Sequence, residues 1–205
     1  MPSSPSPAIV LIISGPAGSG KTTLCERLLQ EYPDSITRLV TTTSRQPREG
    51  EIDGVDYHFL PVPVFEKKIK AGEFIEWAMV HGRYYGSQTA HILEGLASGR
   101  DLLLNIDVQG AAAFRRQQET NPQLAGKIHS LFIKPASIEQ LYSRLLGRGT
   151  DDQKEINRRL DSAKKEILAA DEFDTVITSD CRESDFTALL HHYKSLKARL
   201  TQGTT

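Results

Sequence analysis

The sequence predicts an α/β fold in which helices cover both faces of a parallel sheet. The apolar runs at 8–14 and 102–106 lack the polar alternation of half-exposed strands, which is typical of strands buried on both sides. Amphipathic stretches separate the runs, and such β/α alternation is typical of a parallel sheet. The first run passes into a glycine-rich segment and then into a helix over 23–30. A chain of 205 residues suits one compact domain with inserted subdomains.

The glycine-rich segment reads GPAGSGKT over residues 15–22, a complete G-x-x-x-x-G-K-[ST] phosphate loop. Glycines at these positions let several backbone N–H groups point at one phosphate chain. Lys21 then reaches the outer phosphates, and the Thr22 hydroxyl is placed to bind Mg²⁺. A strand, a loop and a helix in this order set the helix N-terminus against the anion. The segment therefore predicts a site for a nucleoside triphosphate with Mg²⁺.

The β/α alternation is interrupted after the first helix. A short strand at 36–40 precedes a polar segment rich in Thr, Arg and Gly, and residues 55–59 alternate as a half-buried strand does. Beyond them we expect a helix at 63–70 closed by Gly72, a strand at 74–80, a turn at 82–86 and a helix at 88–97.

The alternation resumes after residue 100. The C-terminal helix carries apolar residues at helical spacing from Phe186 to Leu200. We interpret this stripe as core packing, with a partner-binding face as the alternative. The other expected elements are a strand at 102–107, a helix at 108–118, a strand at 127–133, a helix capped by Ser137, a helix at 153–170 and a strand at 175–177.

Two insertions therefore interrupt the predicted core. We expect the first seven residues, 1–7, to form a disordered leader. In doubly wound sheets, ligands bind at the carboxyl ends of the strands, where the phosphate loop, Thr41 and Asp107 fall. The predicted boundaries are a core of 8–40, 90–143 and 158–205, a β-rich insertion of 41–89 and a smaller insertion of 144–157 rich in Arg and Gly.

Composition narrows the class of protein. Apolar residues at 39% and charged residues at 25% are typical of a globular chain. The net charge of −1 provides no field that draws in nucleic acid or a membrane, and no run approaches the roughly 18 apolar residues of a membrane span. Cys25 and Cys181 lie far apart and lack metal-ligand spacing. We therefore expect reduced thiols in a cytoplasmic protein, and the sequence leaves monomer and homodimer open.

Among phosphate-loop proteins, a small GTPase is disfavoured because the chain has no Asn-Lys dipeptide for an N-K-x-D guanine motif. A kinase for a phosphorylated acceptor needs a second anion site. Arg45 and Arg48 fit such a site, since guanidinium groups bind phosphate through two parallel hydrogen bonds. Tyr57 and Tyr85 can add phenol donors. The alternative for the two arginines is a solvated polar loop.

A kinase also needs cations that approach the transferring group. Arg144, Arg148, Arg158 and Arg159 lie around a Gly-Arg-Gly-Thr sequence at 147–150, which is typical of a small lid. The alternative is charge on helix surfaces, paired with neighbouring acidic residues, and it stays open for Arg144 and Arg158.

Taken together, the chain after the leader resembles the guanylate kinases, enzymes that transfer the γ-phosphoryl group of ATP to GMP. Seven blocks in the same order make the resemblance more specific than any one block. They are residues 14–23, 45–51, 56–59, 73–77, 84–87, 106–110 and 147–150.

The resemblance implies a role for each matching position. Glu76 is implied to read guanine, and a carboxylate suits the adjacent N1–H and amine donors of that base, which adenine lacks. The catalytic cations implied are Lys21, Arg148 and Arg159. The ATP-binding residues implied are Gly15, Ala17, Gly18, Ser19, Gly20, Lys21, Thr22 and Thr23, with Thr22 on Mg²⁺. The GMP-binding residues implied are Thr41, Arg45, Arg48, Tyr57, Glu76, Tyr85, Ser87 and Asp107, and dGMP is a possible acceptor.

The chain departs from the family pattern at several positions. Thr41 stands where many relatives have Ser, and Asn105 replaces a first Asp two residues before Asp107. Asp107 is therefore interpreted either as a ligand of a Mg²⁺-bound water or as a contact to the guanine amine. Ser179 stands where Asn is common near adenine, so the adenine contacts stay unassigned.

Two other functions stay open at this point. A guanylate-kinase-like interaction module without turnover is disfavoured because Lys21 and Thr22 are both present. An enzyme with another acceptor, such as AMP or a nucleoside, is disfavoured by the interpretation of Glu76 as a guanine reader.

Overall fold

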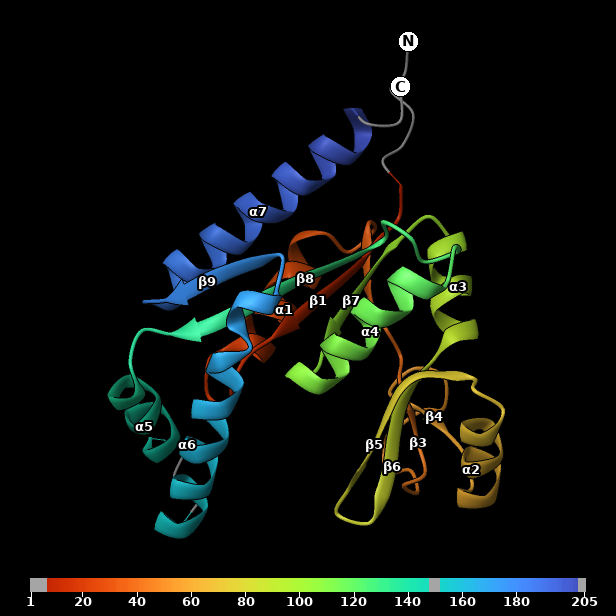
Figure 1. Cartoon of the computed structure of the whole chain (residues 1–205), viewed down its shortest axis with the longest axis horizontal. Helices are drawn as coiled ribbons and strands as arrows, with labels where there is room; N and C mark the ends of the chain where they lie inside the picture. Colours follow the sequence, from red (N-terminus) through yellow and green to blue (C-terminus); the bar gives the residue numbers. More distant parts are fainter. Residues whose placement is uncertain (1–6, 148–151, 203–205) are drawn as a thin grey trace.

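The computed structural model describes residues 7–147 and 152–202. Its centre is a parallel sheet of five strands in the order β2-β7-β1-β8-β9 (Figure 1). Helices cover both faces of this sheet, which confirms the predicted three-layer α/β fold. The strands are β1 (Val10–Ser14), β2 (Ile36–Arg38), β7 (Asp101–Asn105), β8 (Ile128–Pro135) and β9 (Thr175–Ser179).

Alternate side chains of β1 pack into two separate apolar layers. Val10 and Ile12 contribute to the layer beneath α3 (Thr89–Ala97) and α4 (Val108–Thr120). Leu11 and Ile13 contribute to the layer beneath α1 (Lys21–Glu31) and α7 (Arg182–Gln202). Every residue of β1 is buried, as the continuous apolar run predicted.

The apolar stripe of α7 belongs to the core. Phe186, Leu189 and Tyr193 are buried and pack in the same cluster as α1 and β1. Core packing, and not a partner-binding face, is therefore the correct interpretation of this stripe. Cys25 is buried in the same layer and Cys181 is exposed, and both are free thiols.

A second sheet of four strands, in the order β4-β3-β6-β5, is built from the insertion. Figure 1 shows it with α2 on one side of the core, while α5 and α6 project on the other side. The elements are β3 (Thr42–Thr43), β4 (His58–Phe59), α2 (Val62–Lys70), β5 (Phe74–Val80) and β6 (Arg83–Gln88).

The predicted turn at 82–86 is wrong, because most of this segment belongs to strand β6. The chain reverses at His81 and Gly82, which both have positive φ. Gly86 lies inside β6, and a Cβ there would come within 2.7 Å of the Glu76 carbonyl oxygen. The glycine therefore marks a close approach of two strands and not a turn.

The predicted strand at 55–59 is shorter than expected. Only His58 and Phe59 form β4. The preceding residues form side-chain hydrogen bonds instead: Asp56 accepts from the Ile52 N–H at 2.8 Å, and Asp53 accepts from the Phe59 N–H at 2.9 Å. Such local acceptors compete with a strand ladder and keep the loop irregular.

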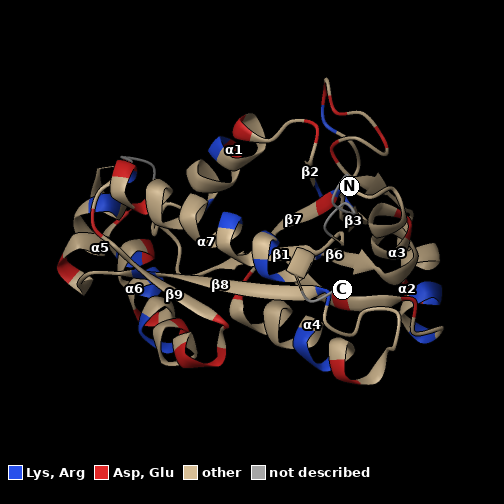
Figure 2. Ribbon diagram, turned by 90° about the horizontal axis from the view of Figure 1, so that it is seen from above, with Lys and Arg blue, Asp and Glu red and all other residues tan. Residues whose placement is uncertain are grey.

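Helices α5 (Ile138–Leu146) and α6 (Gln153–Leu168) pack on each other through an apolar cluster of their own. Ser137 caps α5, as predicted, by accepting a hydrogen bond from the Gln140 N–H at 3.1 Å. The predicted helix at 153–170 ends at Leu168, and a short 3₁₀ turn follows. Within the described ranges, no helix is long and apolar enough to cross a membrane. Basic and acidic residues are interspersed over the helices (Figure 2).

Asp101, the first residue of β7, joins the core sheet to α7. This side chain is buried and accepts from the Ile9 N–H at 3.0 Å, from the Tyr193 hydroxyl at 2.7 Å and from the Lys197 ammonium at 2.8 Å. A carboxylate with three donors is stable in this position, whereas the donors alone are not.

We predict that Asp101→Ala lowers the free energy of unfolding by about 3 kcal/mol or more, because buried donors lose their acceptor. Urea unfolding followed by circular dichroism measures the loss. Asp161→Ala is the matched control, since Asp161 forms an exposed pair with Lys164 and should cost under about 1 kcal/mol. Equal losses in the two variants would contradict the role given to Asp101.

Candidate active site

The phosphate loop between β1 and α1 depends on glycine at three positions. Gly15, Gly18 and Gly20 have φ values of 139°, 90° and 97°, which side-chain-bearing residues rarely adopt. At Gly15 a Cβ would lie 2.4 Å from the Ile133 carbonyl oxygen of β8. The backbone of the loop therefore packs directly against the backbone of β8, with no room for a side chain at Gly15.

Lys21 begins α1 and folds back over the loop. Its ammonium donates to the carbonyl oxygens of Gly15 and Pro16, the second at 2.9 Å. The buried hydroxyl oxygens of Ser14 and Ser19 have no hydrogen-bond partner within the described part of the chain. Buried polar groups usually have partners, so these two hydroxyls are suited to a ligand with hydrogen-bonding oxygens.

The carboxyl end of β7 lies beside the loop. Asn105, the last residue of β7, donates from its amide to the Thr22 hydroxyl at 3.4 Å. Asp107 caps α4, where its carboxylate accepts from the Gly110 N–H at 2.8 Å. The edge thus collects a hydroxyl, an amide and a carboxylate, all with oxygen atoms that suit a hard cation.

A cleft of about 560 Å³ lies between the insertion and the carboxyl end of β7. It is lined from both sides, by the second sheet and by the start of α4. Five of the eight residues predicted for the acceptor side meet in it, namely Thr41, Tyr57, Glu76, Tyr85 and Asp107.

Glu76 has an environment unlike that of a surface carboxylate. The pairing of β5 with β6 shifts register between Phe74 and Glu76, and the Ser87 hydroxyl donates to the Glu76 carboxylate at 2.6 Å. Burial raises the pKa of Glu76, the hydrogen bond from Ser87 opposes that shift, and the negative charge of Asp107 adds to it. The group is therefore best stabilised as a carboxylate when further donors reach it.

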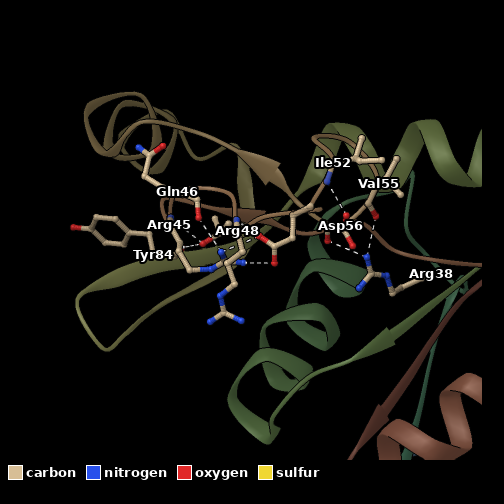
Figure 3. A network of polar contacts seen from close by, with 10 residues as sticks. Arg38, Arg45, Gln46, Arg48, Ile52, Val55, Asp56 and Tyr84 are labelled. Atoms are coloured by element: carbon tan, nitrogen blue, oxygen red, sulfur yellow. Dashed lines mark hydrogen bonds and ion pairs between the residues drawn. The ribbon is translucent and has the colours of Figure 1, made fainter.

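Arg45 is held in a defined position and is not a solvated surface group. It forms a bidentate ion pair with Glu51, with N–O distances of 2.8 and 2.9 Å (Figure 3). Its guanidinium lies 5.5 Å from the ring centre of Tyr57. Glu51 also accepts from the Arg48 N–H at 2.7 Å. The hydrogen bond from Arg45, then that from Arg48, lowers the pKa of Glu51 to about 2.

The Arg48 side chain is exposed, in contrast to that of Arg45. A third arginine, Arg38 at the end of β2, donates to the carbonyl oxygens of Val55 and Asp56 at 2.9 Å each (Figure 3). It ties the core sheet to the insertion.

The predicted lid arginines have different surroundings. Arg158 and Arg159 both bind Glu155, which lowers the pKa of that carboxylate to about 2. For Arg158 this matches the helix-surface alternative. Arg144 instead donates to the Ser179 hydroxyl at 3.0 Å. Arg148 lies outside the described residues.

A second cavity, of about 350 Å³, continues from the phosphate loop toward α5 and α7. Its walls include the loop residues Gly18 to Gly20, Thr23 and Arg144. They also include Arg182 and Asp185, which no motif in the sequence identified as site residues, because their proximity to the loop comes from the packing of α7 alone.

A model of the guanylate kinase family matches residues 8–196 of this chain. The chain belongs to the guanylate kinase family. The resemblance of the seven sequence blocks is thereby confirmed over nearly the whole described structure.

Curated guanylate kinases support the same assignment. The chain is 44% identical to the guanylate kinase of Nitratidesulfovibrio vulgaris over 90% of this chain and 86% of that protein. It is 42% identical to the guanylate kinase of Aromatoleum aromaticum over 90% and 88% of the two chains. The crystal structure of guanylate kinase from Anaplasma phagocytophilum matches with a TM-score of 0.67 and 28% identity, over 94% of this chain and 87% of that one.

We predict that Gly15→Ala destabilises the fold by about 3 kcal/mol or more, because a backbone clash adds to the unfavourable φ. Gly99→Ala is the matched control: Gly99 has a φ of 80°, but a Cβ there would meet nothing within 4 Å. This control should cost only about 1 to 2 kcal/mol. Chemical denaturation of both variants checks the difference, and a Gly15 variant as stable as the control would disprove the close approach.

Proposed function

We propose that this chain transfers the γ-phosphoryl group of ATP to GMP, forming ADP and GDP in purine nucleotide metabolism. The observation that carries the proposal is the partly buried Glu76, which lines the cleft between the second sheet and the start of α4 and already accepts from Ser87. Membership of the guanylate kinase family supports it.

On the acceptor side, Glu76 is proposed to accept from guanine N1–H and from the exocyclic amine. Ser87 and Thr41 are proposed to donate to the guanine O6 atom. Adenine lacks the adjacent donor pair and would leave the partly buried carboxylate with the Ser87 donor but without donors from the base, which is the basis of strong discrimination. The proposed guanine site accepts dGMP as well, since none of its base contacts involves the sugar.

The acceptor phosphate is proposed to bind Arg45, Arg48, Tyr57 and Tyr85. The bidentate pair with Glu51 supports this role for Arg45, because it holds the guanidinium in one orientation before the phosphate arrives. Arg48 is exposed and thus accessible to the same anion.

On the donor side, the proposed ATP site is formed by the loop N–H groups, Lys21 and residues up to Thr23. Mg²⁺ fits the oxygen atoms collected at the sheet edge: the Thr22 hydroxyl as a direct ligand, and Asp107 through a water molecule. When bound with ATP, the ion neutralises charge on the transferred group and aligns the phosphates.

No side-chain base is required, because the GMP phosphate is already an anionic nucleophile. The work of this chain is to align the two phosphates and to stabilise charge on the transferred group. Lys21, Arg148 and Arg159 are proposed as the catalytic cations. Arg159 is bound to Glu155 in the structure, so the phosphate would share this guanidinium with that carboxylate.

We also propose that this chain is a cytoplasmic enzyme that acts on small molecules and has no nucleic-acid or membrane partner. The net charge of −1 and the interspersed charges in Figure 2 support it, since a protein surface that binds nucleic acid or an anionic membrane needs a cluster of basic residues.

We predict that ADP forms at least about 100-fold more efficiently with GMP than with AMP or UMP, and that dGMP is also phosphorylated. A coupled assay of ADP formation with each monophosphate, at saturating Mg-ATP, measures the ratio of kcat/KM values. Turnover of AMP above that of GMP would overturn the guanine assignment. Binding of GMP without turnover would favour an interaction module.

We further predict that Glu76→Gln weakens GMP binding by about 10- to 100-fold and leaves ATP binding within twofold. The reason is that the NH₂ group of the amide, a donor, replaces one acceptor oxygen opposite the two donors of guanine. Because its pKa is raised, wild-type Glu76 becomes protonated early as pH falls, and GMP affinity should fall with it. The Glu76→Gln variant lacks this component, so the difference between the two pH profiles isolates it from titration of the GMP phosphate.

Titration calorimetry at several pH values gives both affinities. Glu73→Gln is the matched control, because Glu73 is an exposed carboxylate three residues away that pairs with Lys68. Equal losses of GMP and ATP affinity in Glu76→Gln would refute the guanine contact.

A further inference from the structure

The wall of the cavity beside the phosphate loop contains a partly buried polar network that the phosphoryl-transfer residues do not explain. Arg144 donates to the Ser179 hydroxyl at 3.0 Å and to the Asp180 carbonyl oxygen at 3.2 Å. Two of its donor groups are thus occupied, and Arg144 lines the same cavity as Gly18 and Gly20.

Asp185, in the first turn of α7, contacts both of the groups that hold Arg144. This residue is only 5% exposed. One carboxylate oxygen accepts from the Ser179 hydroxyl at 2.6 Å, and the other accepts from the Asp180 N–H at 2.9 Å. The distance to Ser179 is in the range of charge-assisted O–H···O⁻ hydrogen bonds.

The direction of this network is determined by its chemistry. A guanidinium has donors only, so the Ser179 oxygen must accept from Arg144 and give its single proton to Asp185. Asp185 also fixes the Asp180 peptide, whose carbonyl oxygen is the second acceptor of Arg144. Removing the carboxylate therefore loosens both acceptors at once.

We propose that Asp185 is a positioning residue for the donor nucleotide, which acts through Ser179 and the Asp180 peptide to hold the Arg144 guanidinium at the wall of the donor cavity. The inference rests on the proposed use of ATP as donor. A triphosphate bound in the loop extends its nucleoside into the adjoining cavity, and a planar guanidinium held in one orientation stacks on a purine face with little loss of entropy.

Ser179 stands at a position where the resemblance led us to expect an Asn near adenine. In this chain the hydroxyl is committed to Arg144 and Asp185, so it does not act as a reader of the base edge. Ser179, which stands in place of the expected Asn, thus links the Asp185 carboxylate to the Arg144 guanidinium.

The test uses Asp185→Asn and Ser179→Ala in the full-length chain. We expect each variant to raise the KM for ATP about 5- to 20-fold, while kcat and the KM for GMP stay within twofold. Glu183→Gln is the matched control: it removes a carboxylate from the same turn of α7, but from an exposed pair with Arg27, and should leave all three parameters unchanged.

A purely structural role for Asp185 is separated by a double-mutant cycle with Arg144→Ala. If Asp185 acts through Arg144, then Asp185→Asn adds less than twofold to the KM for ATP in the Arg144→Ala background. Additive effects, or equal losses for ATP and GMP, would overturn the proposal. Ser179→Ala keeps the test available if Asp185→Asn fails to fold.

Calorimetric titration with ATP alone separates this inference from the proposed function. Without turnover of GMP by the wild type the proposed function fails, but the affinity for ATP still reports on the network. An unchanged ATP affinity in both folded variants would disprove the positioning role whatever the acceptor is.

Discussion

The site depends on one close approach, that of Gly15 at the end of β1 to the Ile133 carbonyl oxygen of β8. Only a residue without a side chain allows the backbone to turn there at a φ of 139°. Because β1 lies in the middle of the sheet, between β7 and β8, the loop that follows it opens at the edge where Asn105 and Asp107 also lie. The central position of the buried strand β1 thus determines at which edge of the sheet the polar site residues lie.

Three of the cations proposed for the site are held by partners within the chain. Arg45 is bound to Glu51, Arg159 to Glu155, and the Lys21 ammonium to loop carbonyl oxygens. These three cations therefore have defined positions before any nucleotide arrives, which reduces the ordering cost of binding.

Sequence reasoning reached the features that depend on local pattern. The buried strand β1, the phosphate loop, the cap at Ser137 and the carboxylate in the middle of β5 all follow from residue type and spacing. The sequence does not predict strand β6 because Gly82 and Gly86 bracket a short segment, as they do in a turn, and the extended form of this segment depends on pairing with β5 and β3.

Features that depend on distant partners could not be predicted. Glu51 lies in a sequence block of the family, but its bidentate bond to Arg45 depends on how the loop folds. Asp185 lies 41 positions after Arg144, and only the packing of α7 on the sheet brings the two into one network. No spacing rule connects residues that far apart.

The central claim is that two anion sites face each other, one for a triphosphate and one for a guanine monophosphate. A crystal structure with GMP and a non-hydrolysable ATP analogue bound together with Mg²⁺ tests it most directly. The account predicts the guanine edge against Glu76 and Ser87, the GMP phosphate on Arg45 and Arg48, and the donor phosphates on the 15–22 loop. A GMP molecule bound away from the Arg45–Arg48 pair, or a purine edge that does not meet Glu76, would contradict it.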